Sequence, residues 1–217
     1  MSLSKETLAN HYAEYASQPD EWVNNMEKTK RSIVEQVFRV ANFEAGCEPV
    51  KVAVLGASDI RYIPIHQRIF RAAVKRAINM KTFDIDTEHL GGESHSLITH
   101  DATQPFPDAP YTIVFSHELM KFLTPEEQFA TIKRSYEALD ENGLAMHILH
   151  EPSIKGTSEL RAWQHRVNPD ELIRQLEESS IPASKIVFDS ESSAAWLVES
   201  TVIFLQKAGK ITSPGTR

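Results

Sequence analysis

The clearest indication of the fold lies in residues 100–123, which read HDATQPFPDAPYTIVFSHELMKFL. The centre, Tyr111–Ser116, is a short run of β-branched and aromatic residues, the composition typical of a buried strand. Two polar residues, His117 and Glu118, follow it. The sequence TPEE (residues 124–127) then supplies a capping residue, a proline at the first helical position and a glutamate at the third. A buried strand followed by a capped helix is the repeating unit of an α/β sheet.

The same unit recurs on the N-terminal side of this stretch. Residues 50–55 (VKVAVL) form a nearly continuous apolar run, which indicates a strand buried on both faces. A helix is predicted next, because Pro64 suits a first helical turn and apolar residues then recur at every fourth position. Residues 81–86 (KTFDID) predict a second strand, and residues 95–101 a lesser one.

On the C-terminal side the alternation continues and then changes. The helix that starts at TPEE is expected to stop at Asn142-Gly143, before a strand over residues 144–149 (LAMHIL). A second capped helix starts at residues 168–171 (NPDE). Residues 185–189 and 194–205 predict two strands joined by a polar turn, which is a hairpin signature. Together these patterns predict a mostly parallel sheet with helices on both faces and one antiparallel strand.

Composition limits the classes of function. The 217 residues suffice for one substantial domain, and 41% apolar with 24% charged residues is typical of a globular protein. A net charge of -7 disfavours nucleic acid as a partner, because phosphates would be repelled. No run approaches the roughly 20 apolar residues that cross a bilayer, so no membrane partner is expected. The single Cys47 leaves no internal disulfide and favours a cytoplasmic location.

Four local patterns occur in the order found in one large enzyme family. They are VAVLGASDI (52–60), FDID (83–86), the stretch over 100–123 and SYEALDENGLAMHIL (135–149). Each is short and weak alone, but their order and spacing together resemble the class I S-adenosylmethionine-dependent methyltransferases. The patterns correspond to that family's first strand and glycine loop, the acidic end of its second strand, its fourth strand, and the helix, turn and fifth strand that follow.

This resemblance implies a Rossmann-like three-layer α/β/α sandwich with a seven-stranded, mostly parallel sheet and an antiparallel C-terminal strand. It implies one methyltransferase-like domain over residues 1–217, with an N-terminal helical cap over 1–45 and a core over 50–207. The implied cofactor is S-adenosylmethionine. The implied acceptor is a small molecule, which the acidic charge favours. A homodimer is left open.

The resemblance also implies where the nucleoside of the cofactor binds. Ligands of open α/β sheets bind at the carboxyl ends of the strands. Asp84 lies there and is expected to accept both ribose hydroxyls, with Asp86 as the alternative if the strand register is shifted. Asp101 is expected to accept from the adenine amine while the backbone amide of Ala102 donates to the ring. An equally open alternative for Asp101 is a turn acid before Pro105.

The glycine loop completes the implied cofactor site. Gly56 allows the backbone to approach the ligand closely, and Ala57, Ser58 and Asp59 follow it in the loop. Asp59 is a candidate to accept the ammonium group of the cofactor, with a helix-capping or loop acid as the alternative. Ser116, at the end of the predicted fourth strand, is the last residue assigned to cofactor binding.

The loop also departs from the family pattern. The family has an acid and two further glycines where this chain has Val54, Ser58 and Ile60, which predicts a tighter or differently shaped loop. A second hypothesis is therefore a catalytically degenerate protein of this fold with a binding or regulatory role. A nicotinamide-dependent reductase is disfavoured, because Asp59 would repel a pyrophosphate and the glycine triplet of that class is missing.

His117 is the candidate catalytic base, since imidazole titrates near neutrality. A base is needed only where the acceptor must lose a proton, because methyl transfer from a sulfonium mainly requires alignment. A metal site from His117, His147, His150 and Glu151 is a minor alternative, because the two later histidines should point to opposite faces of a strand. No metal is predicted.

Overall fold

A seven-stranded sheet forms the centre of the protein in a computed structural model, which describes residues 3–46, 49–157, 160–188 and 200–208. The strand order is β3-β2-β1-β4-β5-β7-β6. All neighbours pair in parallel except β7, which is antiparallel to both β5 and β6, so the predicted mixed sheet is confirmed. The strands are β1 (Val50–Leu55), β2 (Ile78–Asp84), β3 (Leu97–Thr99), β4 (Tyr111–His117), β5 (Leu139–Leu149), β6 (Ser184–Phe188) and β7 (Ser200–Gln206).

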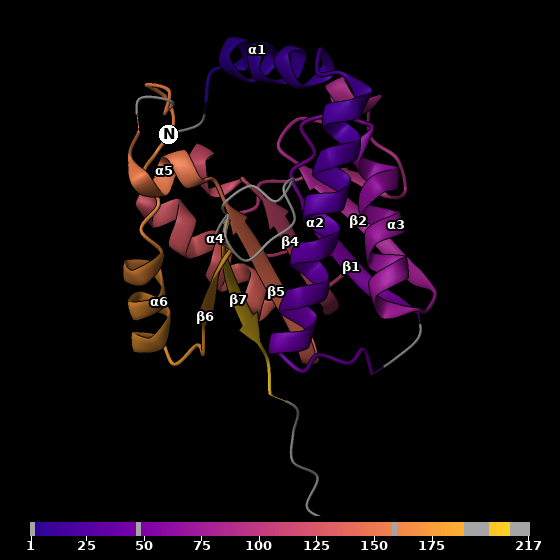
Figure 1. Cartoon of the computed structure of the whole chain (residues 1–217), viewed down its shortest axis with the longest axis vertical. Coiled ribbons are helices and arrows are strands. Elements are labelled where there is room, and N and C mark those ends of the chain that lie inside the picture. The colour runs from indigo at the N-terminus through magenta and orange to yellow at the C-terminus, as the bar shows by residue number, and fades with distance from the viewer. Residues whose placement is uncertain (1–2, 47–48, 158–159, 189–199, 209–217) are drawn as a thin grey trace, which may run out of the picture.

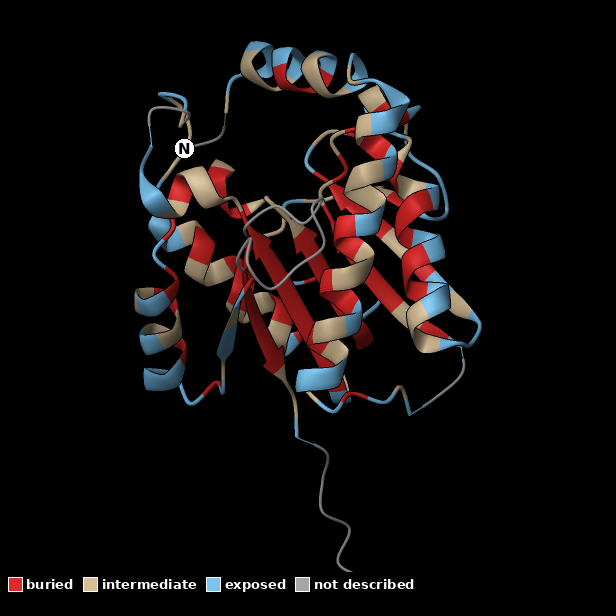
Figure 2. Ribbon diagram, in the orientation of Figure 1, coloured by how far each residue is buried: buried red, intermediate tan, exposed pale blue. Residues whose placement is uncertain are grey.

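Helices cover both faces of this sheet, as the alternation predicted (Figure 1). They are α1 (Lys5–Ala16), α2 (Asp20–Val40), α3 (Tyr62–Val74), α4 (Pro125–Glu137), α5 (Glu151–Lys155) and α6 (Pro169–Glu178). Two short 3-10 turns, Glu88–Leu90 and Met120–Phe122, follow β2 and β4. The central strands are buried almost throughout (Figure 2). Rossmann-like three-layer α/β/α architecture is therefore confirmed.

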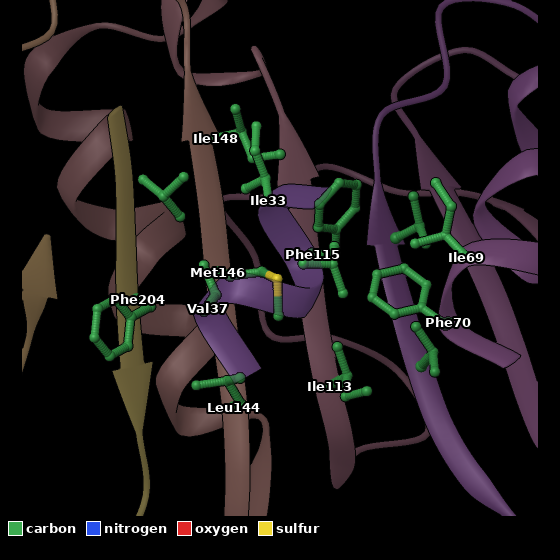
Figure 3. Packing of buried hydrophobic residues seen from close by; sticks show 14 of the residues in the cluster. Ile33, Val37, Ile69, Phe70, Ile113, Phe115, Leu144, Met146, Ile148 and Phe204 are labelled. Atoms are coloured by element: carbon green, nitrogen blue, oxygen red, sulfur yellow. The ribbon is translucent and has the colours of Figure 1, made fainter. Parts of the chain in front are cut away.

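Two separate apolar layers hold the helices to the sheet. On one face, Ile33 of α2 and Ile69 and Phe70 of α3 pack on Phe115 and Met146 of the sheet (Figure 3). The other face is covered by α4 and α6, through Ile132, Leu172 and Leu176 among others. Side chains alternate between the two layers along each strand, which is why β1, β4 and residues 143–149 of β5 are buried at nearly every position.

Both predicted helix starts are confirmed. Thr124 Oγ1 accepts from the Glu127 amide at 3.3 Å while Glu127 Oε2 accepts from the Thr124 amide at 2.8 Å, which is a complete capping box. Asn168 Oδ1 accepts from the Glu171 amide at 3.2 Å. The helix after β4 is thereby fixed to begin directly beyond the loop that follows that strand.

Strand β2 lies earlier in the sequence than predicted. It spans Ile78–Asp84 rather than residues 81–86, because its backbone pairs with the whole of β1 from Val50 onward. After Asp84 the chain leaves the sheet, and the Asp86 amide turns back onto the Asp84 carboxylate at 3.2 Å. Asp84 is thus the last residue of the strand.

Helix α4 and strand β5 also have other boundaries than predicted. The helix stops at Glu137 instead of continuing to Asn142-Gly143, and β5 already begins at Leu139. Asn142 has a φ of 69°, and the pairing of β5 with β4 shifts register near Tyr111, so the turn residues lie inside an irregular start of the strand. The polar turn predicted between the last two strands, and residues 194–199, lie outside the described residues.

Helix α1 stands apart from the two layers. It lies across the end of the molecule at which β4 and β5 terminate, whereas α2 runs along the sheet beside α3 (Figure 1). The carboxyl ends of the parallel strands, where ligands of such sheets bind, therefore face α1. Within the described ranges, no helix is both long and apolar enough to cross a membrane.

Candidate functional site

A cavity of about 180 Å³ lies at the carboxyl ends of the parallel strands. Its walls come from five segments that are distant in sequence: α1, the loop after β1, and the loops after β2, β3 and β4. The lining residues include His11, Tyr12, Gly56, Ala57, Ser58, Asp84, Asp101, Ala102, Leu119 and Phe122. Most of the residues predicted for the cofactor site are thus brought together around one space.

Asp84 is the buried acid of this cavity, with 6% of its surface exposed. Its Oδ2 accepts from the Ala57 amide at 2.7 Å, and its Oδ1 accepts from the Tyr12 hydroxyl and the Asp86 amide, both at 3.2 Å. Burial raises the pKa of Asp84, although these donors act in the opposite direction. Each carboxylate oxygen can accept about two hydrogen bonds. Oδ1 already accepts two and Oδ2 accepts one, so about one acceptor position remains open on Oδ2. Asp86 does not line the cavity.

Asp101 is a turn acid at the wall of the cavity, and its contact with an adenine stays a prediction. It lines the cavity, and its Oδ1 also accepts from the amide and the hydroxyl of Thr103 at 2.9 Å and 2.8 Å, which makes it a turn acid. Oδ2 takes part in neither of these two bonds. Ala102 follows it in the cavity wall, so the pair has the placement predicted for residues beside an adenine.

The glycine loop is held by its own hydrogen bonds. The Gly56 amide donates to the Phe83 carbonyl at 2.7 Å, and Gly56 has a φ of 78°, which side chains rarely adopt. Ser58, which stands where the family has glycine, has its Oγ 3.3 Å from His11 Nε2 of α1. The serine therefore contacts the helix that covers the cavity.

Helix α1 reaches the cavity at a second point. The Tyr12 hydroxyl donates to Asp84, and the Tyr12 ring stacks on His89 with 3.4 Å between ring centroids and 4° between planes. Burial and the charge of Asp84 raise the pKa of Tyr12, so its hydroxyl keeps its proton. The hydroxyl can donate to Asp84 and accept from a ligand at the same time.

Two predicted cofactor residues lie elsewhere. Ser116 is fully buried, with its Oγ 2.8 Å from His147 Nδ1, and it lines no cavity described here. Asp59 lies behind the loop, where its carboxylate accepts from the Arg61 side chain at 2.5–3.1 Å. Burial alone would raise the pKa of Asp59, but the hydrogen bonds and charge of Arg61 hold it below its usual value. The Asp59 carboxylate is thus already paired within the protein.

A second, smaller cavity of about 30 Å³ adjoins the first and shares Gly56, Ala57, Ser58 and Phe122 with it. It lies between α2, α3 and the end of β4, and its polar lining includes Lys30, His66, His117, Glu118 and Lys121. Glu118 Oε2 accepts from Lys121 Nζ at 2.6 Å. The space is sized for a small polar group or a water molecule rather than for an acceptor molecule.

Lys30 is one of two buried lysines of the small cavity, with 3% of its surface exposed, and the other, Lys121, is paired with Glu118. Its Nζ lies 3.2 Å from His66 Nε2 and 3.8 Å from the centre of the Tyr62 ring. In the described part of the chain no carboxylate pairs with it, and His66 Nδ1 is buried without a partner. Burial lowers the pKa of Lys30 to about 7. Among the described residues, Lys30 is therefore a buried ammonium of the cavity wall without a carboxylate partner, while Glu118 of the same wall is paired with Lys121.

Lys30 is not among the site residues predicted from the sequence. Its signal is helical spacing, because Lys30 shares the buried face of α2 with Met26, Ile33 and Val37. A lysine on an apolar stripe is rarely fully buried without a reason. His66 of α3 follows the same pattern beside Ile65 and Ile69.

His117 lines the small cavity and not the large one. Burial, with the charge of Lys30 as the next cause, lowers the pKa of His117 to about 3. The imidazole is therefore neutral at pH 7 and a weak base, and its catalytic role stays a prediction. Among the described residues, no group of three or more His, Cys, Asp or Glu side chains is arranged to hold a metal ion.

No protein-family model matches the sequence, and no curated protein matches it. Solved structures do match. The N-methyltransferase NodS from Bradyrhizobium japonicum WM9, in complex with S-adenosyl-L-homocysteine, is 10% identical with a TM-score of 0.57, over 93% of this chain and 97% of that chain. The magnesium protoporphyrin IX methyltransferase ChlM from Synechocystis PCC 6803 with bound SAH is 13% identical with a TM-score of 0.55, over 85% and 84%.

A third similar structure is an S-adenosylmethionine-dependent methyltransferase from Clostridium acetobutylicum ATCC 824. It is 8% identical with a TM-score of 0.59, over 84% of this chain and 92% of that chain. At identities this low, the likeness concerns the fold.

Proposed function

The chain has the fold of the class I S-adenosylmethionine-dependent methyltransferases, and we propose that it binds S-adenosylmethionine and transfers its methyl group to a small molecule. One observation carries the proposal. The large cavity, with Asp84, Asp101 and Ala102 in its wall, shares Gly56 and the residues after it with a small cavity that is lined by the buried Lys30. This arrangement matches S-adenosylmethionine, which has a nucleoside at one end and an amino acid at the other.

The nucleoside end is assigned to the large cavity. Adenine would lie beside Asp101 and Ala102, within reach of Leu119. The ribose would lie at Asp84, whose open position on Oδ2 takes one hydroxyl. The second hydroxyl would donate to the Tyr12 oxygen, which itself donates to Asp84. The two ribose hydroxyls, which the sequence assigned to Asp84 alone, are thereby divided between Asp84 and Tyr12.

The amino-acid end is assigned to the small cavity. An amino acid is a zwitterion, and this cavity offers the Lys30 ammonium, the Lys121 ammonium and the Glu118 carboxylate, of which the last two already pair with each other. The carboxylate of the cofactor would accept from Lys30, and its ammonium group would lie near Glu118. Asp59, the first candidate for that ammonium, is taken by Arg61. Charge complementarity in a water-poor site makes each of these contacts strong.

Chemically, the chain has to align an acceptor with the methyl carbon. S-adenosylmethionine, when bound, supplies a methyl group on a sulfonium centre that leaves as a neutral thioether. The side chains hold the nucleoside and the amino acid at fixed ends, so the donor has one orientation. With a pKa of about 3, His117 would remove a proton only slowly, so the proposal favours acceptors that need no strong base.

A second candidate is a binding or regulatory protein of this fold without methyl transfer. The observation that favours it is the loop itself, where Ser58 contacts His11 and Asp59 contacts Arg61 instead of leaving glycine backbone open. Such a protein could bind the nucleoside and still lack an acceptor position.

A thermal shift measurement tests the proposed cofactor. Saturating S-adenosylhomocysteine should raise the melting temperature, because a ligand at about 100 times its Kd adds about 2.7 kcal/mol to the free energy of unfolding. NADH at the same concentration should not, since the loop that would hold its pyrophosphate lacks the glycine triplet of that class of protein. No shift with millimolar S-adenosylhomocysteine would contradict the proposal, and a shift with NADH alone would support a reductase. Binding without methyl transfer to any acceptor in a small-molecule panel would support the second candidate.

A further inference from the structure

Arg61 joins two parts of the protein that are far apart in sequence. It precedes α3 directly after the glycine loop, and 29% of its side chain is exposed. Its Nε donates to both Asp59 oxygens, at 3.1 Å and 2.9 Å, and its Nη2 donates to Asp59 Oδ2 at 2.5 Å. The guanidinium is therefore fixed to the loop that lines both cavities.

The remaining donors of Arg61 are directed at the end of α1. Nη2 donates to the carbonyls of Tyr15 at 3.0 Å and Ala16 at 3.3 Å, and Nη1 donates to the Gln18 carbonyl at 2.9 Å. Nη1 also donates to Asp20 Oδ1, at the start of α2, at 2.9 Å. The last carbonyls of a helix have no partner within it, and a cation is favourable at that end. Arg61 is thus the C-terminal cap of α1, supplied from the cofactor loop.

The other polar contacts of α1 surround the large cavity. His11 contacts Ser58, and Tyr12 contacts Asp84. Beyond these, Glu14 pairs with Arg161 at 2.6 Å on the exposed side. A helix with few apolar contacts to the sheet depends on such contacts for its position.

We propose that Arg61 is a positioning residue that holds α1 over the bound nucleoside, so that the loop and the helix act as one unit in cofactor binding. The inference rests on the proposed function. It gives a physical role to one of the departures in the loop, Ser58, and to the acid that follows it: Ser58 contacts His11 of α1, and Asp59 holds the Arg61 side chain that caps α1. Tyr12 and His11 then reach the ligand only while Arg61 caps their helix.

Arg61→Lys is the variant that tests this role. The lysine keeps a positive charge beside the buried Asp59, so the fold should persist, but one ammonium group cannot span Asp59, Asp20 and three carbonyls as a guanidinium does. We expect amide hydrogen exchange in α1 to accelerate at least about tenfold, and S-adenosylhomocysteine affinity to fall about tenfold. Arg68→Lys is the matched control, because Arg68 lies on α3 and pairs with Glu27 of α2, away from α1.

A double-mutant cycle shows whether Arg61 acts through α1. Tyr12→Phe alone should weaken S-adenosylhomocysteine binding by removing the hydroxyl that accepts from the ribose. In the Arg61→Lys background the same change should cost almost nothing, because α1 no longer presents Tyr12. Losses that add in full, or α1 exchange equal to that of the wild type, would overturn the inference. If the wild type itself did not bind S-adenosylhomocysteine, the proposed function would fail, while the exchange measurement would still decide whether Arg61 holds α1.

Discussion

Asp84→Asn is expected to weaken S-adenosylhomocysteine binding by about tenfold to a hundredfold. The open acceptor position of Asp84 lies on Oδ2, which also accepts from the Ala57 amide. An amide of equal size has no charge, and its nitrogen cannot accept from the ribose. Hydrogen bonds to charged groups contribute roughly 1.5 to 3 kcal/mol, which corresponds to the stated range. Titration calorimetry with both proteins measures the difference directly.

Burial raises the pKa of Asp84, so its charge does not itself stabilise the fold above the usual pKa of a carboxyl. The melting temperature of Asp84→Asn without ligand should nevertheless fall, because the buried carboxylate accepts from three donors and an amide nitrogen would face at least one of them. Asp86→Asn is the matched control, because Asp86 accepts from the Glu88 amide and does not line the cavity. If Asp86→Asn weakened binding and Asp84→Asn did not, the ribose would have been placed at the wrong carboxylate.

Lys30→Met should weaken S-adenosylhomocysteine about tenfold to a hundredfold and leave 5′-methylthioadenosine unaffected. The second ligand has the same nucleoside but no amino-acid end, so it does not reach Lys30 in the small cavity. Methionine fills a similar volume without charge, and removal of a buried ammonium should not lower the melting temperature. Lys28→Met is the control, because Lys28 lies on the same helix but is exposed, beside Asn25. Equal losses for both ligands would place the amino-acid end elsewhere.

The pKa of Lys30 predicts that the affinity of the wild-type protein for S-adenosylhomocysteine depends on pH. Burial lowers the pKa of Lys30 to about 7 in the free protein, and a bound carboxylate would raise it again. The charged form binds, so S-adenosylhomocysteine affinity should be highest below pH 7 and fall as the pH rises above it. Affinity for 5′-methylthioadenosine should stay flat between about pH 6 and pH 8, and Lys30→Met should remove the slope.

Much of the fold follows from local patterns. The caps at Thr124 and Asn168 were predictable because each side chain bonds a backbone amide three residues away. The mostly parallel sheet with one antiparallel strand followed from the alternation of strands and helices and from the terminal hairpin signature. The start of β2 at Ile78 was not predictable, since it depends on pairing with Val50 across the sheet rather than on its own sequence.

The site was predictable only for residues at or just beyond the end of a strand. Asp84 ends β2 and Asp101 follows β3, and the resemblance located both near the cavity. Asp59 illustrates the limit, because its partner Arg61 is near in sequence while the carbonyls that orient Arg61 belong to α1. Lys30 enters the site from α2 through packing of the helix on the sheet, which no local motif records.

A structure of the wild-type protein with S-adenosylhomocysteine tests the central proposal most directly. The account predicts the adenine beside Asp101 and Ala102, a ribose hydroxyl on Asp84, and the amino-acid carboxylate on Lys30, with α1 closed over the ligand. Ligand bound outside the cavity beyond Gly56, or an empty cavity at saturating S-adenosylhomocysteine, would contradict it.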